Sequence, residues 1–314
     1  MTPEQVLAEA PRVLSQGQRE RYFAQGYLLV ENAVPMDWIE RLRAITDEMV
    51  ERSRRQTKSD EVFDLEPGHS AATPRLRRLS SPVIHHPLYW EFIATSPLGD
   101  IAADLLGPDV KFHHAKLNFK WAEGGEEVKW HQDITFWPHT NYGVLTIGTY
   151  LYDCGPEQGP LGVIPGSHEG PLFNQFNDHD EWVGCIAERD LAGIALDKAD
   201  YLMGPAGSIT IHHCRAVHGS RPNQSDTGRP LLLNTLSSAD ALPYTHNPLT
   251  TPYYGQCIRG RPARVAHHDP RPCPLPPDWS GGYSSIFALQ QEEGIDAELL
   301  ADRLRHAKQP ASVM

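Results

Sequence analysis

The sequence has no long apolar run, no leader pattern and few cysteines, and each absence excludes a class of protein. No apolar stretch reaches the roughly 18 residues that a membrane span needs. Residues Met1 to Gln5 lack the basic and apolar regions of a signal peptide. The five cysteines are widely spaced without a C-x-x-C pair, which disfavours a disulfide framework or a zinc–cysteine site. We therefore expect a cytoplasmic protein with reduced cysteines and no membrane partner.

Positive charge is scarce relative to negative charge. The 314 residues include 28 Lys and Arg against 40 Asp and Glu, a formal net charge of −12. This sign opposes any general attraction to nucleic acid or anionic membranes, so neither is expected as a partner. Hydrophobic residues at 40% and aromatic residues at 9% are typical of a globular chain with a sizeable core. A small molecule is the expected partner, and a local group of Lys and Arg can still bind an anionic one.

Helical periodicity dominates the chain to about residue 108. Residues 18–25 and 36–54 are expected helices, and a helix over 97–106 ends at a Gly-Pro stop signal. The apolar stripe of the second helix comprises Ile39, Leu42, Ile45 and Met49.

The segment 64–82 shows neither helical nor strand periodicity and carries Arg75, Arg77 and Arg78. We expect an irregular, solvated basic loop here. A receptor for an anionic substrate is the alternative function of these arginines.

From about residue 109 the pattern changes to short strands separated by Gly and Pro turns. A helical flank followed by such strands indicates a mainly β jelly roll, the double-stranded β-helix of cupin-like proteins. We expect one domain over residues 1–314. Its parts are a helical N-terminal flank to about 108, a jelly-roll core over about 109–238 and a Pro-rich extension over 239–314.

One expected strand, Val110 to Trp121, is polar on one face. His114, Lys116, Asn118 and Lys120 share one parity, and apolar residues share the other. A polar inner face fits a barrel mouth that holds a polar ligand.

The segment Trp130 to Asp133 contains a pair of metal-ligand residues. His131 and Asp133 are two residues apart, so on a strand their side chains point the same way. A second histidine would complete the two-histidine, one-carboxylate set of non-haem Fe(II) oxygenases, which leaves open positions and a net charge of about +1 on the ferrous centre. By itself, however, the His-x-Asp pattern also occurs by chance.

His218 is the preferred third ligand, because Gly219–Ser220 follows it and Arg229 lies downstream. The competitors are His212 and His213 on the preceding strand; the alternative role for one of them is a buried, hydrogen-bonded histidine beside the metal site. Arg229 opens an apolar strand and can bind a carboxylate through two parallel hydrogen bonds, to which the Ser220 hydroxyl can add a third.

With these residues in place, the chain resembles the phytanoyl-CoA dioxygenase-like family of Fe(II)/2-oxoglutarate-dependent oxygenases. The resemblance covers roughly residues 18 to 238. The matching motifs are Tyr22–Val30, His131–Asp133, Gly159–His168, His218–Ser220, Asn223 and Arg229.

The resemblance implies Fe(II) on His131, Asp133 and His218, with the distal carboxylate of 2-oxoglutarate on Arg229 and Ser220. It implies O₂ as second cosubstrate and oxidative decarboxylation to succinate and CO₂, coupled to hydroxylation of an unactivated C–H bond in a small molecule.

Further cosubstrate contacts are implied from His114, Lys116, Asn118 and Lys120, and from Thr149. Halogenating relatives carry a small residue at the carboxylate ligand. Because the carboxylate ligand is present here, an oxygenase is implied.

Two other functions stay open: a cupin-like metalloenzyme that does not use 2-oxoglutarate, and a non-catalytic barrel that binds a ligand. Loss of 2-oxoglutarate affinity in Arg229→Ala separates the first from the oxygenase. His168 is expected to be structural, Phe136 and Trp137 to line the pocket or pack in the core, and Cys214 to be a target of oxidation. The sequence assigns no role to His267–His268, and it leaves the substrate and the oligomeric state open.

Overall fold

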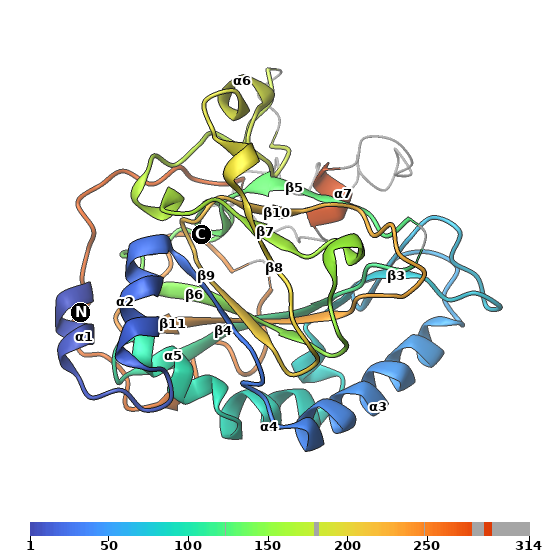
Figure 1. Cartoon of the computed structure of the whole chain (residues 1–314), viewed down its shortest axis with the longest axis horizontal. Coiled ribbons are helices and arrows are strands. Elements are labelled where there is room, and N and C mark those ends of the chain that lie inside the picture. Colours follow the sequence, from blue (N-terminus) through green and yellow to red (C-terminus); the bar gives the residue numbers. More distant parts are fainter. Residues whose placement is uncertain (123, 179–181, 248, 278–285, 291–314) are drawn as a thin grey trace, which may run out of the picture.

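The computed structural model describes residues 1–122, 124–178, 182–247, 249–277 and 286–290. It is built mainly from two antiparallel β-sheets that form a jelly roll, with helices against the larger sheet (Figure 1). The predicted fold class is confirmed. Within these residues, no helix is both long enough and apolar enough to span a membrane.

Eight strands form the larger sheet. Their bounds are β1 Tyr27–Val30, β2 Phe63–Leu65, β3 Leu76–Ser80, β4 Val110–Asn118, β6 Val144–Tyr150, β9 Ile209–His213, β11 Leu231–Ser238 and β12 Cys257–Arg259. The order is β1-β9-β6-β11-β4-β3-β2, and β12 also pairs with β4. Because β3 and β11 flank β4 on opposite sides, residues from distant parts of the sequence surround its polar face.

The smaller sheet carries two of the three expected metal ligands, His131 and His218. Its strands are β5 Val128–His131, β7 Leu161–Val163, β8 Asp200–Leu202 and β10 His218–Ser220. They pair in the order β5-β10-β7-β8.

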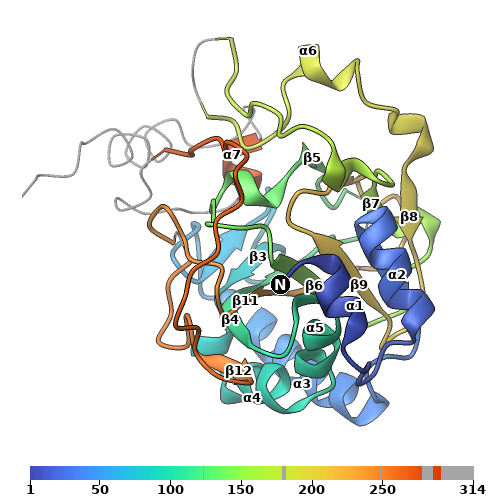
Figure 2. The ribbon, with the colours of Figure 1, turned by 90° about the vertical axis from the view of Figure 1, so that its left-hand side faces the viewer.

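Helices cover the outer face of the larger sheet (Figures 1 and 2). They are α1 Pro3–Ala8, α2 Gln16–Gln25, α3 Met36–Ser53, α4 Pro87–Thr95 and α5 Leu98–Leu106. The predicted stripe of α3 packs in the main core with residues of the sheet such as Leu117 and Ile147. Each of its four apolar side chains is at most 8% exposed, and burial of such a side chain stabilises the fold by about 1.5–3 kcal/mol.

The prediction of an irregular basic loop over 64–82 is wrong. The segment contains the end of β2 and the whole of β3, which pair with each other. The arginines can be part of a β-hairpin because nearby carboxylates neutralise them: Arg75 forms an ion pair with Glu66, and Arg77 forms one with Asp64. Pairing across the hairpin, which the sequence pattern does not reveal, replaces the solvation that a loop would have provided.

The C-terminal extension lies along the core and returns to the site. Besides β12 it supplies the short helix α7 Ile286–Gln290, which contacts β5. Residues 278–285 and 291–314 of the expected extension lie outside the described residues. Among the described residues between β7 and β8, the chain is largely irregular and contains the short helix α6 Glu188–Leu191 and a few turns.

Candidate metal centre

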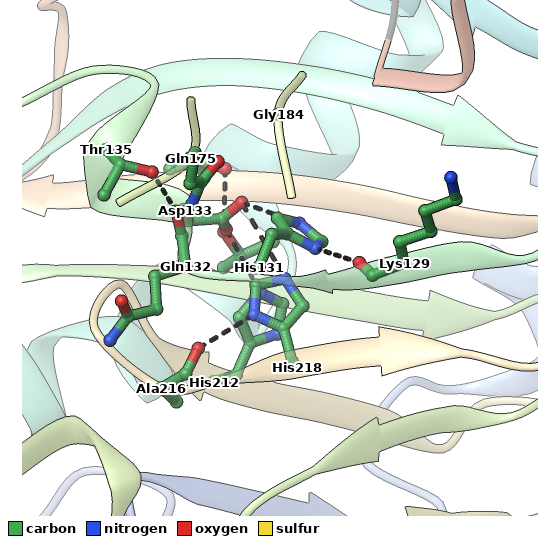
Figure 3. A network of polar contacts seen from close by, with 12 residues as sticks. Lys129, His131, Gln132, Asp133, Thr135, Gln175, Gly184, His212, Ala216 and His218 are labelled. Carbon is green, nitrogen blue, oxygen red and sulfur yellow. Dashed lines mark hydrogen bonds and ion pairs between the residues drawn. The ribbon is translucent and has the colours of Figure 1, made fainter. Parts of the chain in front are cut away.

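His131, Asp133 and His218 converge at the edge of the smaller sheet (Figure 3). His131 ends β5 and His218 begins β10, and the two residues are in register, so their rings lie side by side with centroids 4.1 Å apart. Asp133 begins the 3₁₀ turn that follows β5. One possible ligand atom from each residue lies within 4.8 Å of the others, and each residue is at most 4% exposed. The structure thus assembles the predicted three ligands in one place.

Backbone hydrogen bonds fix which nitrogen of each ring faces the centre. The Nδ1 atom of His131 lies 2.8 Å from the Lys129 carbonyl, and that of His218 lies 3.0 Å from the Ala216 carbonyl. A carbonyl only accepts, so both Nδ1 atoms carry the proton and both Nε2 lone pairs face Asp133, at 3.7 and 3.8 Å from its Oδ1. Burial lowers the pKa of His131 to about 4 and that of His218 well below its usual value, so both rings are neutral and able to ligate.

Asp133 is held through its other oxygen. Oδ2 accepts hydrogen bonds from His212 Nε2 at 3.2 Å and from the Thr146 hydroxyl at 3.1 Å, which leaves Oδ1 for an ion. Burial alone raises the pKa of the Asp133 carboxyl, but the charge of Lys116 and the neighbouring histidines outweigh burial and hold that pKa well below its usual range. A carboxylate that stays ionised next to two neutral imidazoles fits a divalent iron.

The two competing histidines have other positions. His212, on β9, holds the carboxylate as described and is not part of the ligand group. The ring of His213 points toward Tyr22 and His168, with centroids 6.3 and 5.3 Å away. The alternative interpretation of His212, a buried histidine beside the metal site, is the one that its geometry supports.

A hydrogen-bond chain continues behind Asp133 across the larger sheet. Thr146 Oγ1 is 2.9 Å from Thr235 Oγ1, Thr235 Oγ1 is 3.4 Å from His114 Nε2, and the Nδ1 atoms of His114 and His113 are 2.6 Å apart. The Thr146 proton is directed to Asp133, so Thr235 must donate to Thr146, and His114 Nε2 must donate to Thr235. His114 Nδ1 then accepts from His113. Both ring nitrogens of His114 are therefore engaged within the protein.

The Thr146→Val substitution is expected to weaken Fe(II) binding about 10-fold, because removing a partner of a metal-ligating carboxylate typically costs 10- to 100-fold in affinity. Valine preserves the shape, so the effect isolates the hydroxyl. Thr149→Val is the matched control: Thr149 lies on the same strand and is fully buried, and its Oγ1 has no hydrogen-bond partner among the described residues. Anaerobic Fe(II) titration of both variants measures the difference. Equal affinities would show that Thr146 does not position the carboxylate.

Arg229 lies two residues before β11, with its side chain in the cavity beside the ligands. It is 3% exposed; Nη2 donates to the Gly159 carbonyl at 2.6 Å, and Nε has no partner within the described residues. No carboxylate among the described residues forms an ion pair with the Arg229 guanidinium. Ser220, at the end of β10, lines the same cavity. A buried arginine without an acidic partner is suited to bind an external carboxylate.

Lys120 also lines the cavity but is used structurally. Its ammonium group donates to the backbone carbonyls of Glu126 and Arg221 at 2.5 Å each and of Ser220 at 3.5 Å. An ammonium group has three protons, so these contacts occupy all of them. Lys120 therefore fixes the turn that carries Ser220, and the geometry does not favour the predicted cosubstrate contact.

The other residues of β4 that were predicted to contact the cosubstrate line two different cavities. Lys116 and Asn118 line the cavity with Arg229, whereas His114 lines a second cavity with Phe136, Trp137 and Leu249. Lys116, Asp133 and Ile286 line both cavities, so the two meet beside the ligands.

The prediction for Thr149 is wrong. Side chains alternate along β6, so Thr146 faces the ligands and Thr149 points to the opposite face, that of Ile147 and the helical core. The sequence predicts that alternate residues of β6 point to opposite faces of the sheet. It does not say which set of residues points toward the metal ligands.

The minor candidates are also placed. His168 Nε2 bonds the Phe23 carbonyl at 3.0 Å, in keeping with a structural role. Cys214 is fully buried, and burial raises the pKa of its thiol well above the usual value, which disfavours the expected oxidation. His267 Nδ1 lies 2.6 Å from Asp240 Oδ2 at the surface.

Comparison with known proteins identifies a family and several relatives of similar sequence. Residues 22–231 match the family described as phytanoyl-CoA dioxygenase (PhyH). A Stutzerimonas stutzeri protein named "Probable alpha-ketoglutarate-dependent hypophosphite dioxygenase" is 30% identical over 229 residues, 72% of this chain and 79% of that relative. An ectoine dioxygenase of Bordetella parapertussis is 26% identical over 279 residues, 81% of this chain and 82% of that relative.

Solved structures agree on the fold. EctD from S. alaskensis, crystallised with 2-oxoglutarate and 5-hydroxyectoine, superposes with a TM-score of 0.61 at 22% identity over 84% of this chain and 91% of that chain. The family match, the relative at 30% identity and the assembled ligand group lead to one conclusion: the chain belongs to the phytanoyl-CoA dioxygenase (PhyH) family of Fe(II)/2-oxoglutarate-dependent oxygenases.

Proposed function

We propose that this protein is an Fe(II)- and 2-oxoglutarate-dependent dioxygenase that hydroxylates an unactivated C–H bond of a small molecule, with release of succinate and CO₂. The observation that carries the proposal is the buried ligand group beside Arg229, an arginine without an acidic partner among the described residues. Iron held there would supply O₂ activation coupled to decarboxylation of the cosubstrate. His131, Asp133 and His218 would hold it.

In this proposal, the chain binds 2-oxoglutarate between the metal ligands and Arg229. Arg229 and Ser220 receive the distal carboxylate, and Lys116 and Asn118 face the cosubstrate from β4. His114, with both ring nitrogens engaged, contributes shape and support. The second cavity, with Phe136 and Trp137, is the proposed place for the substrate.

The direct test is anaerobic addition of Fe(II) and 2-oxoglutarate to the metal-free protein. The expected result is the weak visible charge-transfer band of the iron–keto acid chelate, followed in air by succinate release with the right substrate. Bound iron without the band would favour the cupin-like metalloenzyme. No iron binding would leave the non-catalytic barrel.

The Arg229→Ala substitution is expected to raise the 2-oxoglutarate concentration needed for half-maximal band intensity by about 100-fold. Charge-assisted hydrogen bonds in a buried site contribute about 1.5–3 kcal/mol each, and 1.4 kcal/mol corresponds to tenfold in affinity. Arg221→Gln is the control, because that guanidinium stacks over Tyr201, 4.5 Å from the ring centroid, and is outside the cavity lining. An unchanged affinity in Arg229→Ala would contradict the assignment of the distal carboxylate.

The relatives supply first substrates for the screen: hypophosphite, ectoine and L-proline, after which those enzymes are named.

A cytoplasmic location is part of the proposal, supported by five cysteines of which none is in a disulfide.

A further inference from the structure

The rings of the two histidine ligands are oriented by hydrogen bonds of different origin. The carbonyl that accepts from His218 Nδ1 belongs to Ala216, in the turn between β9 and β10, where the Ala216 N–H in turn donates to the His213 carbonyl at 2.9 Å. The carbonyl that accepts from His131 Nδ1 belongs to Lys129, on β5 (Figure 3). A local turn therefore orients His218, whereas the orientation of His131 depends on how β5 is fixed.

The pairing of β5 with β10 is interrupted just before the ligand. His131 pairs with His218, and the next pair joins Val128 to Ser220, so β5 has one residue more than β10 between the two pairs. Such a bulge disrupts the ladder and leaves a residue without its regular partner. Lys129 lies in this bulge, so its backbone groups need partners from elsewhere.

Both backbone groups of Lys129 have partners outside the ladder. The carbonyl accepts from the ring of His131, and the N–H donates to Oε1 of Gln290 on α7 at 2.8 Å. Gln290 is 161 residues away in the chain and belongs to the C-terminal extension. The extension thus supplies the hydrogen-bond partner that the bulge removes, and it fixes the residue whose carbonyl orients His131.

The Gln290 amide is itself held at both ends. It is 2% exposed, and its Nε2 donates to the Gly184 carbonyl at 2.7 Å. Gly184 lies between β7 and β8, and two residues later the Ile186 N–H donates to the Trp130 carbonyl of β5 at 2.8 Å. Three segments that are far apart in the sequence therefore meet at this amide, with α7 beside β5 (Figure 1). Because its oxygen accepts and its nitrogen donates, the amide has one orientation.

Gln290 is outside both cavities of the site. Ile286 and Phe287 of the same helix line the cavity beside the ligands, but Gln290 belongs to the lining of neither cavity. Its polar partners among the described residues are the Lys129 N–H and the Gly184 carbonyl. The buried amide is therefore placed to act on β5 and not on the cosubstrate or the substrate.

We propose that Gln290 is a positioning residue of the iron centre: by fixing Lys129 in the bulge of β5, it holds the His131 ring with its Nε2 lone pair toward Asp133. The inference rests on the proposed function. Without the amide, the Lys129 carbonyl is free to turn away and the Nδ1–H of His131 loses its acceptor. The neutral ring then also adopts the tautomer with the proton on Nε2, which has no lone pair there for a metal.

The first readout is the ring tautomer in the metal-free full chain at neutral pH, measured by nitrogen NMR of labelled histidines that are assigned by substituting each ligand in turn. Both ligands are expected to carry the proton on Nδ1 in the parent. Gln290→Met, similar in size but without an amide, is expected to give a mixture of tautomers at His131. His218 is the internal control and is expected to stay unchanged, because its acceptor lies in a local turn.

The second readout is Fe(II) affinity, measured by anaerobic titration. Gln290→Met is expected to bind Fe(II) about fivefold more weakly, less than the roughly 10- to 100-fold cost of removing a group that contacts a ligand directly, because Gln290 acts through Lys129. Gln256→Met is the matched control: the same exchange at an exposed position of the same extension, where the amide bonds the Pro252 carbonyl. It is expected to keep the affinity and both tautomers of the parent.

A conservative variant separates the two bonds of the amide. Gln290→Glu keeps an oxygen for the Lys129 N–H and loses the donor to Gly184, so it is expected to restore the Nδ1–H form of His131. The same mixture of tautomers in Gln290→Glu as in Gln290→Met would assign the effect to the Gly184 bond and overturn the inference. If Gln290→Met does not fold, Gln290→Ala provides the same comparison.

Two further results would overturn the inference. One is an unchanged His131 tautomer or an unchanged Fe(II) affinity in Gln290→Met. The other is a change at His131 and His218 together, because a general loss of structure affects both rings. Failure of the proposed function is distinguishable: the parent then gives no iron–keto acid band, whereas the tautomers are compared in protein without metal.

Discussion

Asp133→Asn is expected to abolish turnover, by at least about a thousandfold, which corresponds to about 4 kcal/mol of activation free energy. The two donors on Oδ2, His212 Nε2 and the Thr146 hydroxyl, decide how an asparagine would sit. Its amide oxygen would accept their protons, which turns the amide NH₂ toward His131 and His218. An amide nitrogen has no lone pair for a metal, so the charge and the third ligand are lost together.

The measurement is anaerobic Fe(II) titration followed by succinate release. Asp100→Asn is the matched control: Asp100 also pairs with cations, Arg12 and Arg259, but lies on α5 outside the cavity lining. The control is expected to bind iron as the parent does. Iron affinity in Asp133→Asn within a few-fold of the parent would mean that the ion does not bind Asp133.

Local patterns were sufficient for much of this molecule. The helices α2, α3 and α5 and the His131–Asp133 pair follow from periodicity and spacing over a few residues. The order of ligands and the arginine after His218 then led to the family. These features depend on neighbours in the sequence, which is why they could be predicted.

The errors all concern contacts between distant segments. Thr149 was predicted to face the cosubstrate but points to the opposite face of β6. The sequence does not say which face of this strand lies toward the metal ligands. Lys120 is engaged by carbonyls about a hundred residues away, such as that of Arg221, and the fold alone brings these together. Arg75 forms an ion pair with Glu66 across the β2–β3 hairpin, whereas Arg78, three residues later, forms none with the described residues. The sequence shows charge, but the fold decides which charges are paired.

Acidification from pH 6.5 to 5.5 is expected to reduce the free energy of unfolding by about 4 kcal/mol, through four buried histidines outside the metal ligands. Burial lowers the pKa of His139 to about 4 and those of His113, His114 and His213 well below the usual value. An unfolded histidine has a pKa of about 6.5. Below that pH the unfolded chain takes up protons that the folded chain does not, so stability falls as pH falls, until the folded pKa is reached.

Each of these histidines contributes about 1 kcal/mol to the loss over this interval, against a total stability on the order of 5–15 kcal/mol. Carboxyl groups have reference pKa values of about 4 and titrate mostly below this pH interval, so the histidines account for most of the loss of unfolding free energy. Urea unfolding of the metal-free protein at several pH values measures the loss. In that form the neutral ligands His131 and His218 add about 1 kcal/mol each with the same sign, so the measured total is expected to be about 6 kcal/mol.

A substitution identifies the source of the slope. His139→Gln removes one buried ring whose Nε2 has no hydrogen-bond partner among the described residues, so the loss of stability between pH 6.5 and 5.5 should shrink by about 1 kcal/mol. Thr149→Val, a buried substitution that removes no titrating group, is the control and should leave the slope unchanged. A parent slope near zero would mean that the buried rings are protonated in the folded chain. Two protonated imidazoles could not ligate iron, so acid stability and the metal centre depend on the same property: a core that keeps its histidines neutral.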